Sequence, residues 1–216
     1  MIQKVLPITA FILFALPVFA EDGWILRKDS DGIVVYTRPV KGTEYSQFRA
    51  ITKVKTTLFS VLAMWADPDT YTDWMFNCKA ASLLKKETRQ VYITYIVSAV
   101  PWPLLNRDNI LQADTSQDEV TGKITIILTG KPDFIPKVKN MIRVVQTYGK
   151  VELMPLEGGE VEVVFEFFMN PGGLIPAPII NLTIIDFPFF TLKKLRDVVK
   201  KPKYQEVDYE FFKNFP

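Results

Sequence analysis

The chain has 216 residues, 48% of them hydrophobic and 23% charged, with no histidine and a single cysteine, Cys78. The absence of histidine excludes Ser-His-Asp and Cys-His catalysis and His-ligated zinc or iron. One cysteine excludes an internal disulfide framework, a Cys-rich zinc site and an iron–sulfur cluster. The 26 basic and 24 acidic residues are too balanced for a nucleic-acid-binding surface. Carboxylate chemistry, a lone thiol, or binding without chemistry therefore remain.

The first 20 residues have the composition of a secretory signal peptide. Residues 1–4 carry one lysine and precede an uncharged apolar run of 14 residues, 5–18. That run is short for a membrane span, which takes about 20 residues. The small residues ending at Ala20 resemble a cleavage site. We expect residues 1–20 to be removed and the protein to be exported, with a bacterial periplasm favoured over secretion. An uncleaved N-terminal anchor is the alternative.

The body of the chain, residues 21–200, is predicted to be one domain that is mostly β-structure. Strands are expected at 33–38, 45–54, 80–86, 91–97, 108–114, 123–129, 142–153 and 160–169. A helix is expected from Leu58 to Trp65, because apolar residues recur at helical spacing after Thr56 and Thr57, which can cap it. The segment 201–216 is a polar and aromatic tail with no predicted structure.

Short turns between successive strands predict an antiparallel sheet. In the last strand Val161, Val163, Phe165 and Phe167 fall at every second position and so share one apolar face, with Glu160, Glu162 and Glu166 on the other. Such a face must be covered. The candidate is the long apolar helix predicted over about residues 175–200. The sequence therefore predicts an α+β fold in which a curved sheet surrounds this helix.

Six short motifs, in this order of elements, resemble the START family of lipid-binding domains over about residues 24–199. They are Trp24 with Asp31-Gly32-Ile33-Val34-Val35-Tyr36, Asp67 with Tyr71 and Trp74, Pro101-Trp102-Pro103 with Arg107-Asp108, Ile142-Arg143, Pro171-Gly172-Gly173-Leu174-Ile175-Pro176, and Leu192-Lys193-Lys194-Leu195-Arg196. The resemblance implies a helix-grip fold whose apolar tunnel holds one lipid and is opened by the C-terminal helix and a neighbouring loop. Sterol-binding members are expected to carry a charge where this chain has Ala113, so a sterol ligand is not implied.

Eight side chains are candidates for the wall of this tunnel. They are Tyr92, Tyr95, Trp102, Arg107, Leu111, Ile180, Ile184 and Phe187. For Tyr92, Tyr95 and Trp102, ordinary core packing is the favoured alternative. Arg107 could contact a polar group of the ligand or could form a structural ion pair that orders the preceding proline-rich loop, and the second role is favoured. Because neighbours on a strand point to opposite faces, Arg107 and Asp108 should have different partners.

The segment 131–141 is too long and apolar for a plain turn between two strands. Its apolar residues Phe134, Ile135 and Val138 stand among lysines. We expect this segment to be a lid over the tunnel mouth that touches a membrane, with lysines near anionic head groups. The alternative is a loop whose apolar residues pack onto the body of the protein.

The function expected from the sequence is the binding of one lipid, with transfer outside the cytoplasm. No catalytic residue, metal or cofactor is expected; the partners are a lipid and, transiently, a membrane surface, and the protein should be a monomer. Cys78 is expected to be a buried spectator. One alternative is a cyclase or hydrolase on the same scaffold that uses carboxylate, tyrosine or arginine chemistry. Another is a lipid sensor tethered by an uncleaved N-terminus.

Overall fold

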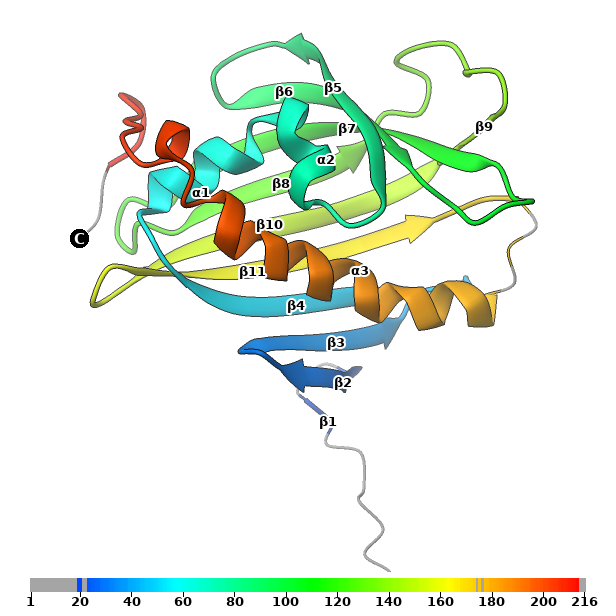
Figure 1. The fold of residues 1–216 in the computed structure, drawn as a ribbon, viewed down its shortest axis with the longest axis horizontal. Helices are drawn as coiled ribbons and strands as arrows, with labels where there is room; N and C mark the ends of the chain where they lie inside the picture. The colour runs from blue at the N-terminus through cyan, green and yellow to red at the C-terminus, as the bar shows by residue number, and fades with distance from the viewer. Residues whose placement is uncertain (1–18, 21–22, 174, 176, 214–216) are drawn as a thin grey trace, which may run out of the picture.

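The computed structural model describes residues 19–20, 23–173, 175 and 177–213. In this part of the chain, an eleven-stranded sheet curves around a long C-terminal helix (Figure 1). The strand order is β1-β2-β3-β4-β11-β10-β8-β7-β6-β5, with β9 also paired to β7. Neighbouring strands are antiparallel except for β7 and β9, which are parallel. The predicted α+β helix-grip architecture is confirmed.

The strands are β1 (Phe19–Ala20), β2 (Trp24–Ser30), β3 (Ile33–Pro39), β4 (Ser46–Lys55), β5 (Cys78–Lys86), β6 (Val91–Ser98), β7 (Asn106–Gln117), β8 (Ile124–Gly130), β9 (Met141–Arg143), β10 (Gln146–Leu156) and β11 (Glu160–Asn170). The helices are α1 (Leu58–Trp65), α2 (Tyr71–Trp74) and α3 (Ala177–Val198), with single turns of 3-10 helix at η2 (Pro68–Thr70) and η3 (Pro202–Tyr204). The long helix predicted over about residues 175–200 is thus α3.

Two strands differ from the sequence prediction. Strand β2 was not predicted; it pairs with β3 across a tight turn in which Asp31 and Gly32 both have positive φ. The predicted strand 142–153 is two strands, because the chain leaves β9 beside β7 and then pairs as β10 with β8 and β11. Val144 and Val145 lie at this break. Because valine is common in strands, the sequence does not show that the strand is interrupted there.

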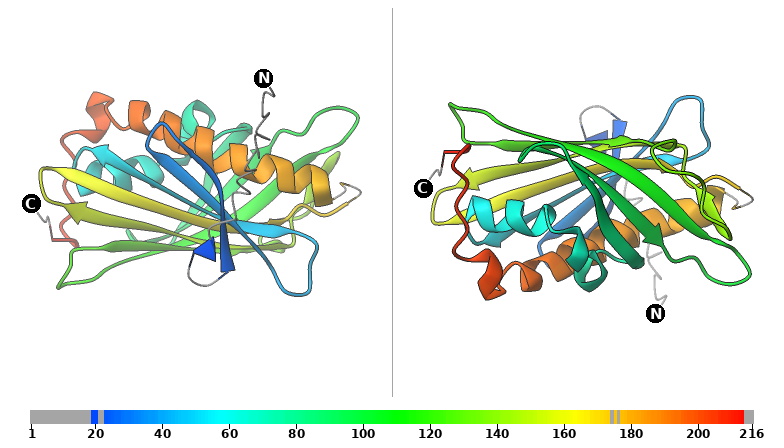
Figure 2. Two further views of the ribbon diagram at one scale, coloured as in Figure 1. Left: turned by 90° about the horizontal axis from the view of Figure 1, so that it is seen from below. Right: turned by 90° about the horizontal axis from the view of Figure 1, so that it is seen from above.

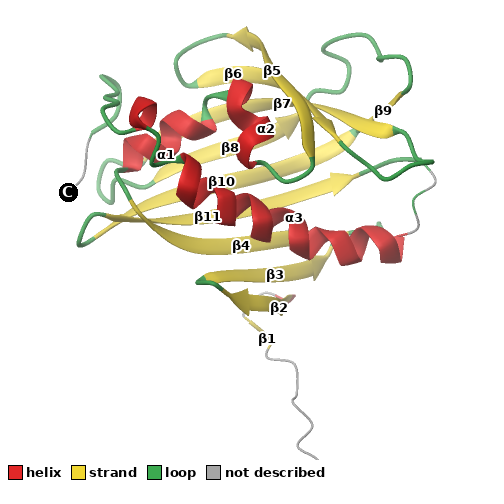
Figure 3. Ribbon diagram, viewed as in Figure 1, coloured by secondary structure: helices red, strands yellow, loops and turns green. Residues whose placement is uncertain are grey.

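The helices all lie on the concave face of the sheet (Figures 2 and 3). The alternation predicted in β11 is confirmed, because Val161, Val163 and Phe165 are buried in the core that faces α3. Helix α3 buries its own apolar stripe, which includes Leu192 and Leu195, against the same core. Burial of these two apolar faces against each other is the main force that holds the layers together.

The C-terminal tail is packed against the body of the protein. The side chain of Tyr204 is buried and shares a hydrogen bond with Asp67, at 2.7 Å between the hydroxyl and the carboxylate. The ring of Tyr209 packs edge-on against Phe59 of α1, with centroids 5.4 Å apart. Gln117 of β7 donates a hydrogen bond to the carbonyl of Lys213. The tail therefore closes the end of the core beside α1.

The predicted signal peptide lies outside the described residues except for Phe19 and Ala20. These two residues form β1 and pair with Ile25 and Trp24 of β2. Among the helices that the structure describes, none is both long enough and apolar enough to cross a membrane.

A buried ion pair fixes the outer face of the sheet, opposite α3. The guanidinium of Arg143 donates to the carboxylate of Asp108 at 2.9 and 3.1 Å, and both side chains are at most 2% exposed. The same guanidinium donates to the backbone carbonyls of Pro132, Ile135 and Pro136. Arg143 thereby ties the segment 131–140 to β7 on the side that faces away from the helix.

Replacing Asp108 by alanine should leave Arg143 buried without a counter-charge. We expect the free energy of unfolding, measured by urea denaturation, to fall by about 3–5 kcal/mol. The matched control is Glu210→Ala, which breaks an exposed pair with Arg89 and should cost less than about 1 kcal/mol. Equal effects of the two substitutions would contradict the assignment.

Candidate ligand-binding cavity

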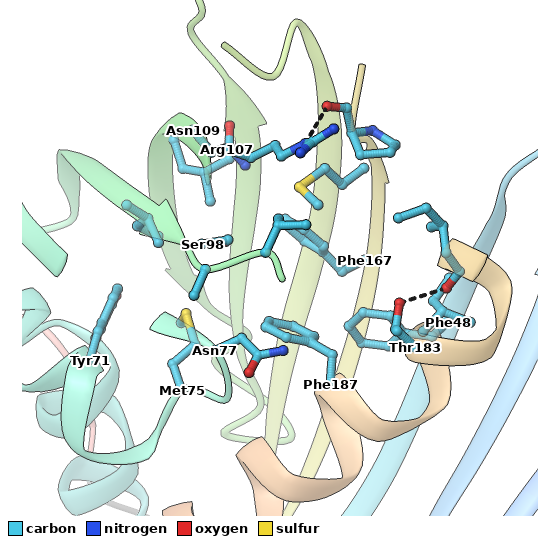
Figure 4. A pocket seen from close by; sticks show the side chains of 18 of the residues that line it. Phe48, Tyr71, Met75, Asn77, Ser98, Arg107, Asn109, Phe167, Thr183 and Phe187 are labelled. Carbon is cyan, nitrogen blue, oxygen red and sulfur yellow. Dashed lines mark hydrogen bonds between the residues drawn. The ribbon is translucent and has the colours of Figure 1, made fainter. Parts of the chain in front are cut away.

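A cavity of about 430 Å³ lies between α3 and the concave face of the sheet. This volume is within the range of about 300–1,000 Å³ that is typical of small-molecule sites. Figure 4 shows part of its wall. The lining residues are Phe48, Trp65, Tyr71, Met75, Asn77, Tyr92, Thr94, Ile96, Ser98, Ala99, Val100, Pro101, Trp102, Pro103, Leu104, Arg107, Asn109, Leu111, Ala113, Leu128, Phe165, Phe167, Met169, Pro171, Ile175, Ile180, Thr183, Ile184 and Phe187.

Two adjacent strands supply much of this wall by strict alternation. From β6 the lining residues are every second one from Tyr92 to Ser98, and from β7 every second one from Arg107 to Ala113. Side chains on a strand alternate between the two faces, so the residues between them point outward. Helix α3 contributes Ile180, Ile184 and Phe187 from the opposite side.

One end of the cavity is aromatic and closed. Phe165 packs against Phe48, Trp65 and Phe187, with ring centroids 4.9, 5.1 and 6.4 Å apart. Such edge-to-face and tilted rings form a rigid apolar wall that offers no charge to a ligand.

Two tyrosines at this end are already hydrogen-bonded. The hydroxyl of Tyr71 donates to the carbonyl of Trp65 at 2.6 Å, and that of Tyr92 donates to the same carbonyl at 3.4 Å. Burial raises the pKa of both hydroxyls well above its usual value. Both phenols therefore stay protonated near neutral pH and are poor candidates for general base catalysis.

Arg107 is the only charged side chain in the lining described above. The lining contains no aspartate, glutamate or lysine, and no group of acidic residues or Cys78 among the described residues is arranged to hold a metal ion. Cys78 lies outside the lining, and burial raises the pKa of its thiol to about 11, so the thiolate is scarce at neutral pH. The cavity thus offers shape and apolar surface rather than reactive groups.

Arg107 is almost completely buried, with 2% of its surface exposed. Its guanidinium donates to the backbone carbonyls of Leu105, Pro171 and Gly172. These bonds hold the turn that leads into α3, and burial lowers the pKa of the guanidinium. The side chain therefore has a structural role, but through hydrogen bonds to carbonyls and not through the expected ion pair, since no ion pair of Arg107 is found among the described residues. It also lines the cavity. Asp108 has a different partner, Arg143, as predicted.

Asn109 lies beside Arg107 in the wall (Figure 4). It is 5% exposed, and its side-chain oxygen has no hydrogen-bond partner among the described residues. A buried polar atom without a partner costs free energy unless something else supplies one. We call Arg107 and Asn109 together the polar end of the cavity.

Seven of the eight predicted wall residues line the cavity, and Tyr95 does not. Tyr95 is three positions from Tyr92 on β6, so it points to the opposite face of the sheet. There it lies near Asp108, and burial, followed by the negative charge of that carboxylate, raises the pKa of the Tyr95 hydroxyl. The prediction for Tyr95 was wrong because it was made from residue type rather than from strand face.

The predicted lid does not cover the cavity. Phe134, Ile135 and Val138 are absent from its lining, because Arg143 holds their segment on the outer side of β7. The lining instead includes consecutive residues 99–104 between β6 and β7. Residues 101–105 are all exposed, and Trp102 is 91% exposed although it also borders the cavity. We call residues 99–105 the mouth loop.

Several lining residues were not identified from the sequence, and two signals could have found them. Alternation from Arg107 leads directly to Asn109, and alternation from Tyr92 leads to Thr94 and Ser98. The mouth loop is a run of exposed apolar residues that includes Pro101-Trp102-Pro103, and apolar side chains exposed together often mark an interaction site. Phe48 and Trp65 enter the cavity through tertiary packing, which no local pattern shows.

Comparison with known proteins gives a consistent result. The START domain model matches residues 12–204. An uncharacterized protein of Pseudomonas aeruginosa is 34% identical over 182 residues, covering 84% of this chain and 89% of that protein. The phosphatidylcholine transfer protein of Rattus norvegicus is 28% identical over 171 residues, covering 76% and 78%. The crystal structure of a STAR-related lipid transfer protein from Xanthomonas axonopodis has a TM-score of 0.78 and 33% identity, covering 83% of this chain and 100% of that one.

Proposed function

This chain belongs to the START domain family, and we propose that it binds one lipid molecule in the cavity between α3 and the sheet and carries it between membranes. The observation that supports this most strongly is the cavity itself, whose described lining is mainly apolar and has a single charged side chain, at one end. A lipid has the same division, with a long apolar part and a polar head.

Affinity would come mainly from the acyl part of the ligand. Burial of apolar surface contributes about 25 cal/mol per Å², before the cost of immobilising the ligand is subtracted. The few polar side chains of the wall would then orient the head group. The similarity to a phosphatidylcholine transfer protein makes a phospholipid one candidate ligand.

The mouth loop is the proposed site of lipid entry. It borders the cavity and exposes Trp102, Leu104 and Leu105 to solvent. Tryptophan favours the interface between water and lipid. We infer that this loop docks on a membrane, which would allow a lipid to enter without crossing water, and that the protein acts as a monomer.

The enzyme alternative has less support. A cyclase or hydrolase without histidine would need a carboxylate, tyrosine or arginine at its substrate. The described lining contains no carboxylate. The hydroxyls of Tyr71 and Tyr92 both donate a hydrogen bond to the carbonyl of Trp65. Arg107 is occupied in part by backbone carbonyls. The geometry thus favours binding over catalysis.

We also propose that the protein is exported through residues 1–20 and works in a bacterial periplasm. The composition of that segment supports this. Cleavage after Ala20 would remove β1 and its pairing with β2, and would leave Trp24 at the start of the sheet.

A substitution that fills the cavity should prevent lipid binding. Ala113 is 2% exposed and lines the cavity, so Ala113→Phe places a ring in the space proposed for the acyl chain. We expect native mass spectrometry of protein purified from a lipid-containing host to show one lipid per chain for the wild type and none for this variant. Ala80→Phe, on an exposed position of β5, is the control and should keep the lipid. Lipid-free wild-type protein, or an unaffected Ala113→Phe variant, would refute the proposed site.

One pair of variants can show which of the two candidate loops contacts the membrane. Trp102→Asp in the mouth loop should slow transfer of a fluorescent phospholipid between vesicles, because a charge opposes insertion into the interface. Phe134→Asp, in the segment first predicted to be the lid, should leave the rate close to that of the wild type. The melting temperatures of both should stay close to that of the wild type, since both side chains are exposed. A slower rate for Phe134→Asp alone would show that the wrong loop has been assigned.

The export proposal predicts a specific mature N-terminus. Mass spectrometry of the protein from its native cells should find a chain that begins at Glu21, in the periplasmic fraction. An intact Met1 would mean that the segment is kept as an anchor.

A further inference from the structure

The polar end of the cavity contains a buried positive charge without a negative partner. Among the described residues, no aspartate or glutamate forms an ion pair with Arg107, whereas Arg143, one strand away, is paired with Asp108. Burying a guanidinium without a counter-charge is expensive, and buried charges are usually paired. Burial accordingly lowers the pKa of Arg107.

The hydrogen-bonding capacity of Arg107 is also incompletely used. A guanidinium has five N–H donors. Three of them reach the carbonyls of Leu105, Pro171 and Gly172, so two have no acceptor in the described part of the chain. Because Arg107 lines the cavity, an acceptor supplied by a ligand can reach this end of it.

Asn109 gives a second, independent indication. Its side chain lines the cavity beside Arg107 and is 5% exposed, and its oxygen has no partner among the described residues. An amide presents both a donor and an acceptor. It can therefore bind an acid oxygen, or a hydroxyl next to one, at the position where Arg107 would supply the charge.

We propose that the preferred ligand is an acidic amphiphile whose carboxylate or phosphate binds between Arg107 and Asn109. Its acyl chain extends from there toward the aromatic end at Trp65 and Phe165. This proposal rests on the lipid-binding function proposed above. Arg107 lies at the end of the cavity next to the mouth loop, whose Leu105 carbonyl it binds. The head group is thus near the entrance and the chain lies deep inside.

The same arginine also fixes the turn that leads into α3. Arg107 holds the carbonyls of Pro171 and Gly172, which precede the helix, and Gly173 in the same turn has a φ of +68°. A β-carbon at Gly173 would lie 2.9 Å from the side chain of Ile142, so the turn is also sterically confined. An acid bound to Arg107 would sit directly beside this turn.

The test uses two pairs of labelled probes that share acyl chains and differ in the head. One pair is oleate and oleyl alcohol, and the other is dioleoyl phosphatidylglycerol and dioleoylglycerol. Each probe is offered in trace amounts in phosphatidylcholine vesicles, and the protein-bound fraction is counted after the vesicles are removed. For each probe, the bound fraction of the variant is divided by that of the wild type. This ratio cancels the different affinities of the probes for the vesicle.

We expect Arg107→Met to lower the bound fraction of an acidic probe by about tenfold, the effect of losing a charged hydrogen bond, and to leave its neutral partner unchanged. A selective loss for oleate identifies a fatty acid as the ligand class, and one for phosphatidylglycerol identifies a phospholipid. Asn109→Leu should act in the same direction, and the side-chain oxygen that it removes has no hydrogen-bond partner among the described residues. The control Thr183→Val changes a polar lining residue away from the polar end and should have no selective effect.

Because Arg107→Met also frees the turn before α3, that variant could lose all four probes by unfolding. In that case the Asn109→Leu variant decides. A selective loss of acidic probes supports the proposal, and equal retention of acidic and neutral probes overturns it. Wild-type protein that retains none of the four probes would refute lipid binding itself, which is a different outcome from lipid binding without preference for an acid.

Discussion

The structure depends on the need to cover the apolar concave face of the sheet. Val161, Val163 and Phe165 of β11 need an apolar partner, and α3 supplies one with Leu192 and Leu195. The helix and sheet pack closely beside α1 but leave a space of about 430 Å³ toward the mouth loop. Protein interiors are normally packed without such voids, and an empty apolar space forfeits contact energy. A lipid in this space would complete the core of the protein.

Two arginines on the same region of the sheet show how placement decides what a charge does. Arg143, on the outer face, is fully paired with Asp108 and fixes a loop. Arg107, on the inner face, lines the cavity, and its partners among the described residues are all backbone carbonyls. Alternation along a strand separates these roles, since Arg107 and Asp108 are adjacent in sequence and point in opposite directions. Among the described residues that line the cavity, Arg107 is thereby the one charged side chain, next to a long apolar surface.

The sequence predicted the architecture well, because strand alternation, short turns and the long apolar helix are local signals of the same fold. It placed Leu111 and Ile184 correctly since each lies on an apolar face that had to be buried. Tyr95 failed because aromatic character does not specify a strand face. The lid was misplaced because an apolar loop gives no sign of the side of the sheet on which it lies. That side is set by the contact between Arg143 and Asp108, which joins residues 35 positions apart.

The central claim is that the space between α3 and the sheet holds the apolar part of a lipid. A crystal structure of the protein loaded with a lipid that carries bromine on its acyl chain tests this directly, through the anomalous signal of the bromine. The account predicts a bromine peak inside the cavity, near Trp65, Phe165 and Phe187. Bromine found only on the outer surface, with the cavity unoccupied, would contradict it.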